Sequence, residues 1–196
     1  MKPRQRLVLT RARNFHKDLL CPPVPVHEIA CSVARVVYVN EPTIKDAACF
    51  YLYSKKDPCI FINMYANPNR LRYSLAHETA HIVLNHFEIL RMFAKNHGIP
   101  INDKIDDKVF FWCDIPQAKQ LLNILEREAE LFAAELLMPM KWLYKPKDKS
   151  DFENLRDSLG VSNQALIYRL EETGIVSRNV IKRILSGHSV GARTPW

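Results

Sequence analysis

The residues of this 196-residue chain that could do chemistry together lie in the stretch His77-Glu78-Thr79-Ala80-His81. The apolar residues around this stretch repeat with helical spacing, and histidines four positions apart share one face of a helix. His77 and His81 can therefore direct two imidazole rings at one metal ion. Glu78 lies about 100° further round the helix, where its carboxylate can reach a metal-bound water without being a ligand. This arrangement is typical of zinc-dependent peptidases.

So short a motif also occurs by chance in proteins that bind no metal, and it needs structural context. The context here is favourable. Asn67-Pro68 is a plausible N-cap and first-turn pair for the helix. An apolar back face lies opposite the two histidines and would anchor the helix, and it consists of Leu75, Thr79, Ile82 and Val83.

A zinc site of this kind needs a third protein ligand. The next histidine, His86, follows His81 by five residues, without the glycine that a third-histidine pattern requires. It also projects onto the apolar back face of a continuous helix, where we expect a capping or core-edge residue. A glutamate from a later helix is the remaining option.

Residues 117–138 form that later helix and carry four glutamates. Helical periodicity places Glu126 and Glu130 on the polar, solvated side, whereas Glu128 and Glu135 point into the apolar stripe. An unpaired buried carboxylate is unfavourable, and a metal ion is one of the few partners that removes this penalty. We predict Glu128 as the third ligand. Glu135 is predicted to support the ligands or to form an ion pair, with a surface position at the helix edge as the alternative.

The two segments together resemble the ImmA/IrrE family of metallopeptidases. This family joins a His-Glu-x-Gly-His helix to a Glu-Ala-(Asn or Asp)-x-Phe-Ala-Ala-x-Leu-Leu-Met-Pro helix, matched here by residues 77–81 and 128–139. The resemblance covers about residues 24–175, although Ala80 replaces the usual glycine and Glu130 stands where Asn or Asp is common. It supports Glu128 as a ligand, and it implies one zinc ion per chain and proteolysis of a repressor-type regulator.

In the predicted reaction, Glu78 takes a proton from the attacking water and later gives it to the leaving amine. Tyr73, near the ligand face, is a candidate for stabilising the transition state. An edge strand next to the zinc helix can hold an extended substrate by main-chain pairing. The strand nearest the motif in sequence supplies the candidates for this role, which are Ile60, Phe61, Ile62 and Asn63.

These elements predict an α+β fold in which a small, mostly antiparallel sheet packs on the metal-binding helix and on the second, glutamate-bearing helix. We expect four parts: a basic N-terminal arm (1–22), a zinc metallopeptidase domain (23–145), a helical, helix-turn-helix-like appendage (146–185) and a loosely ordered tail (186–196).

The formal net charge is +7, and most of it comes from the arm. The arm could contact nucleic acid or an acidic partner, and a solvated, partly mobile terminus is the alternative. No apolar run is long enough to span a membrane, and the N-terminus lacks the core of a signal peptide. Five scattered cysteines predict free thiols in a reducing cytoplasm.

Two rival functions remain open. The appendage could bind DNA through Asn163, Gln164 and Arg169, but residues 151–185 carry equal numbers of basic and acidic residues, and groove binding normally needs a basic face. The chain could also be a zinc-stabilised module that sequesters a repressor without cutting it. The presence of Glu78 counts against this, because binding alone needs no general base. We therefore expect a cytoplasmic zinc endopeptidase that cleaves a helix-turn-helix repressor.

Overall fold

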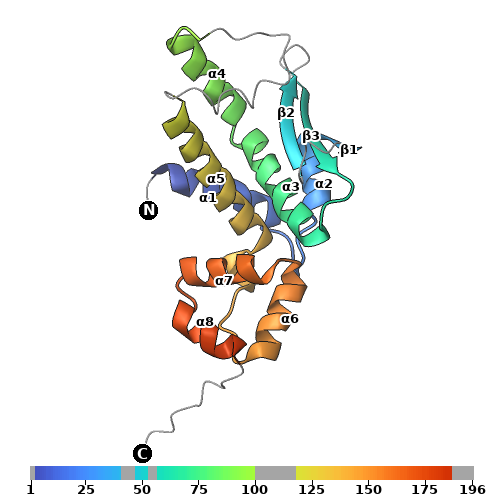
Figure 1. Cartoon of the computed structure of the whole chain (residues 1–196), viewed down its shortest axis with the longest axis vertical. Coiled ribbons are helices and arrows are strands. Elements are labelled where there is room, and N and C mark those ends of the chain that lie inside the picture. The colour runs from blue at the N-terminus through green and yellow to red at the C-terminus, as the bar shows by residue number, and fades with distance from the viewer. Residues whose placement is uncertain (1–2, 41–46, 53–56, 100–117, 187–196) are drawn as a thin grey trace, which may run out of the picture.

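A computed structural model describes residues 3–40, 47–52, 57–99 and 118–186, and helices make up most of this part of the chain (Figure 1). The first half contains α1 (Pro3–His16), α2 (Val26–Val33), β1 (Arg35–Val39), β2 (Ala47–Leu52), β3 (Asp57–Asn63), α3 (Pro68–Val83) and α4 (His86–Asn96). The second half contains α5 (Lys119–Leu137), a short 3-10 turn η2 (Met140–Trp142), α6 (Lys149–Leu159), α7 (Asn163–Glu172) and α8 (Arg178–Leu185). The aromatic stretch at residues 110–112 and the predicted tail beyond Ser186 lie outside the described residues.

The sheet has three described strands in the order β1-β3-β2, with β1 parallel and β2 antiparallel to β3. The prediction of a mostly antiparallel sheet is therefore wrong: the sheet is small and mixed, and helices dominate the fold. A run of apolar and β-branched residues indicates a strand, but it does not specify the direction of the partner. The structure also contradicts an edge role for Ile60, Phe61 and Ile62, because each pairs with β1 on one side and with β2 on the other, whereas Asn63 pairs with β1 in the described register.

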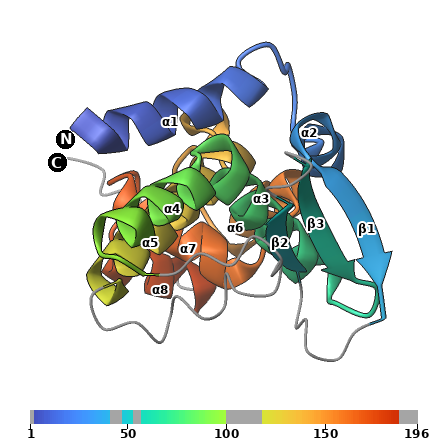
Figure 2. The same cartoon turned by 90° about the horizontal axis from the view of Figure 1, so that it is seen from above.

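Helix α3, which carries the His-Glu-x-x-His motif, lies between α5 and the sheet, as Figures 1 and 2 both show. Small side chains occupy the buried faces of the two helices, with Ala76 and Ala80 on α3 and Ala129 and Ala133 on α5 fully buried. Small residues let two helices approach closely. Side chains that extend from α3 and α5 beside these alanines are thus brought near one another.

Helix α3 ends before His86, and α4 is a separate helix. Asn85 between them has a left-handed backbone with φ 60°, and α4 begins at the next residue. The chain therefore changes direction between the second motif histidine and His86. The projection of His86 onto the back face of one continuous helix does not hold.

The predicted basic arm is a helix, α1, that packs against α5 (Figure 2). Val8 and Ala12 bury its inner face. Three arginines of α1 bind within the protein: Arg4 pairs with Glu128, Arg11 donates to the Val83 carbonyl, and Arg13 pairs with Glu135. The segment is not a free arm, and these three charges are engaged inside the fold.

Helices α6, α7 and α8 form a three-helix unit at the C-terminal end of α5 (Figure 1). The Ser162 hydroxyl accepts a hydrogen bond from the Ala165 amide at 3.2 Å, so Ser162 caps α7. Asp148 caps α6 in the same way through the Asp151 amide at 2.9 Å. None of the described helices is long and apolar enough to cross a membrane.

Candidate metal centre

The two motif histidines meet on one face of α3, one helical turn apart. Their Nε2 atoms are 3.1 Å apart, and the ring centroids are 4.9 Å apart. Glu78 is half-buried on the same turn, and its negative charge acts on His77. The four-residue spacing on α3 thus places both imidazole rings where a two-histidine metal site needs them.

The carboxylate that joins these histidines belongs to Glu126. Its Oε2 lies 3.1 Å from Nε2 of His77, and its Oε1 lies 3.6 Å from Nε2 of His81. Within the described ranges, these three residues form the group whose potential ligand atoms all lie within 4.8 Å of one another. The Glu126 side chain is half-exposed and reaches the site from the rim.

These distances fit a zinc ion. Zinc binds histidine nitrogen at about 2.0–2.1 Å and carboxylate oxygen at about 2.0–2.2 Å with tetrahedral geometry, which separates neighbouring ligand atoms by about 3.3 Å. The observed separations of 3.1 to 3.6 Å bracket this value. Two imidazoles and one carboxylate also form a donor set that zinc uses in hydrolytic enzymes.

Burial, more than the nearby charges, leaves His81 neutral. Burial, followed by the nearby charge of His77, lowers the pKa of His81 to about 3. Burial acts in the same direction on His77, but its hydrogen bond with Glu126 and the charge of Glu78 outweigh burial and raise its pKa. The hydrogen bond with His77 lowers the pKa of Glu126. The anionic form of Glu126 and the neutral form of His81 are the forms that bind a metal.

His86 lies behind the metal-binding face and contacts His81. Its Nδ1 is 3.0 Å from Nδ1 of His81, and its Nε2 is 3.4 Å from Oε2 of Glu128. Glu128 also pairs with Arg4 of α1. Glu128, which the sequence predicts as the third ligand, is therefore buried, as its position in the apolar stripe indicates. Its carboxylate, however, faces His86 and Arg4 and not the two motif histidines.

This row of residues sets the orientation of His81. If Nε2 of His81 holds a metal, its Nδ1 carries the proton and donates to Nδ1 of His86. Burial, followed by the charge of Arg4, lowers the pKa of His86 to about 4, so the ring is neutral and its remaining N–H lies on Nε2, facing Glu128. Outer partners of this kind fix the ring orientation of metal-binding histidines.

Tyr73 lies one turn before His77 on α3, with ring centroids 6.5 Å apart. Burial, followed by the charges of Glu130 and Glu172, raises its pKa to about 12. The phenol therefore stays protonated and can donate a hydrogen bond. Tyr73 thus lies beside the motif histidines, and its role in stabilising a transition state stays a prediction.

Glu135 lies in a buried ion-pair cluster and is not part of the ligand group. Its side chain is 2% exposed and accepts from Arg13 Nε at 2.7 Å and from Arg169 of α7. Glu135 is therefore buried and ion-paired, and it does not lie at an exposed helix edge. Arg169 is itself 4% exposed, which contradicts its predicted place near a DNA groove.

Three residues of the site were not predicted from the sequence. Glu126 is on the solvated face of α5, as expected, but its side chain is long enough to reach the histidines. His86 was placed on the wrong face because α3 ends at Val83. Arg4 was assigned to a free arm. A usable signal was present in α1, where Val8, Ala12 and His16 are spaced as the buried face of a helix.

Comparison with known protein families identifies the segment that contains the motif. Residues 34–107 match the family model of Peptidase_M78, described as the IrrE N-terminal-like domain. Residues 34–107 are an IrrE N-terminal-like segment. The resemblance to the ImmA/IrrE metallopeptidases is thereby confirmed, and the domain suggests a zinc peptidase. The matched segment includes the whole His-Glu-x-x-His motif but ends before α5, so it does not decide between Glu126 and Glu128.

Among solved structures, a Mycobacterium tuberculosis transcriptional regulator is similar to this IrrE-like chain, with a TM-score of 0.52 and 15% sequence identity. The similarity covers 85% of this chain but 46% of the regulator, so this chain spans less than half of that protein. At this identity the similarity concerns the fold alone. No curated protein matches the sequence.

Proposed function

We propose that this chain is a zinc-dependent endopeptidase. The observation that carries the proposal is the convergence of His77, His81 and Glu126 at separations suited to tetrahedral zinc, with Glu78 on the same turn of α3. The IrrE N-terminal-like domain suggests the same class of enzyme. We propose one zinc ion per chain at these three ligands, with the sequence-predicted Glu128 as the alternative third ligand.

A zinc ion held here would supply Lewis-acid activation of water and of the peptide carbonyl. Glu78 would accept the proton of the attacking water at its carboxylate and pass it to the nitrogen of the leaving amine. The protonated phenol of Tyr73 would donate a hydrogen bond to the carbonyl oxygen as negative charge develops there. His86 would keep the His81 ring in its binding orientation.

The substrate chain would pair with an outer strand. β2 has β3 on one side, and α3 packs against it. An extended peptide adds to a sheet through the main-chain groups of such a strand. We therefore propose β2, in place of the predicted residues 60–63, as the strand that aligns the substrate beside the metal centre.

We propose a repressor-type regulator with a helix-turn-helix as the protein substrate, and the cytoplasm as the place of action. The family resemblance supports the substrate class. The M. tuberculosis protein of similar fold is described as a transcriptional regulator, which fits the same biological setting. We do not propose that residues 1–22 bind nucleic acid as a free arm, because Arg4, Arg11 and Arg13 of α1 have partners within the chain.

Glu78→Gln tests the catalytic proposal. The variant removes the proton acceptor and leaves the three proposed ligands, so we expect unchanged zinc content and a loss of cleavage of about 100-fold or more. Zinc is measured by elemental analysis, and cleavage by mass spectrometry on a random peptide pool. Glu88→Gln is the matched control, because Glu88 is exposed on α4 and pairs with Arg91.

Full cleavage by Glu78→Gln would refute the general-base role. Zinc binding by the wild-type protein without cleavage of the pool or of candidate repressors would refute the peptidase. In that case the chain would be a zinc-stabilised module that sequesters its partner.

A further inference from the structure

A second feature of the molecule, distinct from the ligand cluster, is a cleft between the peptidase helices and the three-helix unit. It has a volume of about 1190 Å³. The N-terminal end of α3 and the C-terminal end of α5 form one wall, and α6 and α7 form the other. The residues that matter for the argument are Arg70, Tyr73, Met138, Gln164, Tyr168 and Glu172.

The cleft continues the metal-binding face of α3. Arg70, Tyr73, His77 and His81 follow one another at spacings of three, four and four residues, which places them along one side of the helix. Tyr73 belongs to both places, because its ring is 6.5 Å from that of His77 and it also lines the cleft. A chain bound along this face would run from the metal centre into the cleft.

The facing side of α5 shows the same continuity. Glu126, Glu130, Ala134 and Met138 are each four residues apart, with Glu126 at the histidines and the last two lining the cleft. The charges of Glu130 on α5 and Glu172 on α7 both act on Tyr73. The metal centre and the cleft are thus two parts of one surface.

Helix α7 forms a fixed wall. Arg169 pairs with Glu135, and its Nε donates to the Met138 carbonyl at 3.2 Å, so α7 is tied to the end of α5 by buried contacts. On the cleft side, Gln164 Nε2 and the Tyr168 hydroxyl are 3.5 Å apart. Tyr168 is 54% exposed there, and an exposed tyrosine offers an apolar ring and a polar tip to a peptide.

We infer that α7 is a substrate-recognition wall, and that this cleft binds the segment of a substrate polypeptide that flanks the cleaved bond. This inference rests on the proposed peptidase function. The volume exceeds the roughly 300–1000 Å³ of small-molecule sites. The exposed Tyr168 ring would contact an apolar side chain, and the Gln164 amide would bind the peptide backbone. Helix α7, which a DNA-binding protein would place in the major groove, faces α3 and α5 here.

The test uses the full chain, loaded with zinc and carrying Glu78→Gln so that bound peptides stay intact. The probe is a pool of biotinylated random peptides of about twelve residues, which extend to about 40 Å and can span both the metal centre and the cleft. Binding of the pool is compared with and without Tyr168→Ala. The matched control is Tyr38→Ala, because Tyr38 is 53% exposed on β1 and does not line the cleft.

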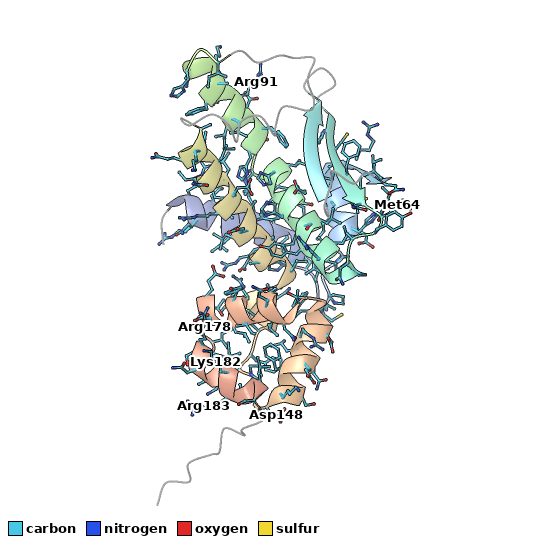
Figure 3. All side chains as sticks on the ribbon, viewed as in Figure 1. Met64, Arg91, Asp148, Arg178, Lys182 and Arg183 are labelled. Carbon is cyan, nitrogen blue, oxygen red and sulfur yellow. The ribbon has the colours of Figure 1, made fainter. Side chains whose placement is uncertain are left out.

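We expect Tyr168→Ala to weaken binding of the pool about tenfold, the effect of losing one aromatic anchor. Tyr38→Ala should leave binding unchanged. Gln164→Trp, which fills the cleft and keeps Tyr168, should weaken binding as Tyr168→Ala does. Lys182→Trp is its control, since Lys182 lies on α8, on the side of the unit away from α3 and α5 (Figure 3).

The outcomes separate this inference from the peptidase proposal. Binding that is indifferent to Tyr168→Ala and Gln164→Trp, or no binding of the pool, would overturn the recognition role of α7. Cleavage by the wild-type protein is measured on the same pool. Cleavage of the pool, together with binding that neither variant changes, would support the peptidase function and overturn the role of the cleft. Binding that depends on Tyr168, without any cleavage, would support the role of the cleft and overturn the peptidase function.

Discussion

Glu126 and Glu128 are two residues apart on α5 and contact different partners. Glu126 lies against His77 and His81, whereas Glu128 pairs with Arg4 and faces His86. Glu126→Ala should therefore remove most of the bound zinc. Glu128→Ala should still bind zinc, but with an affinity about 10- to 100-fold lower, the usual effect of losing a residue that supports a ligand.

Elemental analysis after dialysis against a graded series of chelator concentrations measures both variants. Glu130→Ala is the control, because Glu130 is exposed on the same helix and is not in the ligand group. The opposite order, with zinc lost in Glu128→Ala and kept in Glu126→Ala, would return the third ligand to Glu128 as the sequence predicts.

His86 should act on the metal through His81. His86→Phe keeps a ring of similar size in a site that is 1% exposed, and it removes the nitrogen that lies 3.0 Å from Nδ1 of His81. We expect zinc affinity to fall about 10- to 100-fold with little change in the helical content. Chelator competition and circular dichroism measure the two effects.

His97→Phe is the control for His86→Phe, since His97 is exposed at the end of α4 and contacts the Phe93 carbonyl. Equal zinc affinities for the two variants would show that His86 only fills space.

At the scale of elements, Arg72 ties α3, the helix that carries the candidate metal site, to two other segments. It donates to the Gly160 carbonyl at 3.2 Å and to the Val24 carbonyl at 2.9 Å. Gly160 ends α6 with φ 64°, and a side-chain carbon there would lie 3.2 Å from Nε of Arg72. Gly160 thus permits both the left-handed backbone and the approach of the guanidinium group.

Gly160→Ala and Gly174→Ala form a matched pair that tests this tie. Both positions have a left-handed backbone, but an added carbon at Gly174 meets nothing within 4 Å. Each substitution should lower the free energy of unfolding by about 1–2 kcal/mol through backbone strain. Gly160→Ala should lose about 1 kcal/mol more through crowding of Arg72. Urea unfolding measures the difference, and equal losses would show that Arg72 moves aside freely.

The elements that could be predicted from the sequence are those with a local signal. The apolar periodicity of α3 and α5 and the serine and glycine at the ends of α7 and α6 depend on residues close in the chain. Ser162 caps α7 and Gly160 ends α6, and residues of these two types signal such helix ends in a sequence. Pairing depends on residues far apart, which explains why the parallel partner of β1 and the docking of α1 on α5 were not predicted.

The same distinction applies to the candidate site. His77 and His81 share a face because they are four residues apart on one helix, so the sequence is sufficient to place them. Glu126 and His86 reach the site through the packing of α5 and the turn at Asn85. Neither contact is visible in the spacing of residues along the chain.

At the scale of the whole molecule, a buried cluster joins three separate parts. Glu135 of α5 accepts from Arg13 of α1 and from Arg169 of α7, and His16 of α1 lies 4.0 Å from it. Lys141 donates to the His16 carbonyl at 2.6 Å. Helix α1, helix α5 and the three-helix unit therefore share one electrostatic centre, and residues 146–185 are bound to the rest of the chain by more than a linker.

His16 should make the stability of this junction depend on pH. Burial, aided by Lys141 and Arg13 and opposed by Glu135, lowers the pKa of His16 in the folded protein. As the pH falls below the usual histidine value of about 6.5, the unfolded chain binds a proton that the folded chain resists. The free energy of unfolding should therefore fall with acidification, by at most about 1.4 kcal/mol per pH unit from this residue.

His16→Leu isolates this contribution. Both ring nitrogens of His16 lack a hydrogen-bond partner among the described residues, so an apolar replacement breaks no hydrogen bond. Urea unfolding between pH 5 and 8 should show the wild-type stability falling more steeply towards acid than that of His16→Leu. Parallel curves for the two proteins would mean that His16 titrates normally in the fold.

The docking of α1 has a consequence for synthesis on the ribosome. Arg13 and its partner Glu135 are 122 residues apart in the chain. At about 5–20 residues per second, α1 leaves the ribosome roughly 6–25 s before α5 exists. Throughout that interval the Val8 and Ala12 face has no partner from α5.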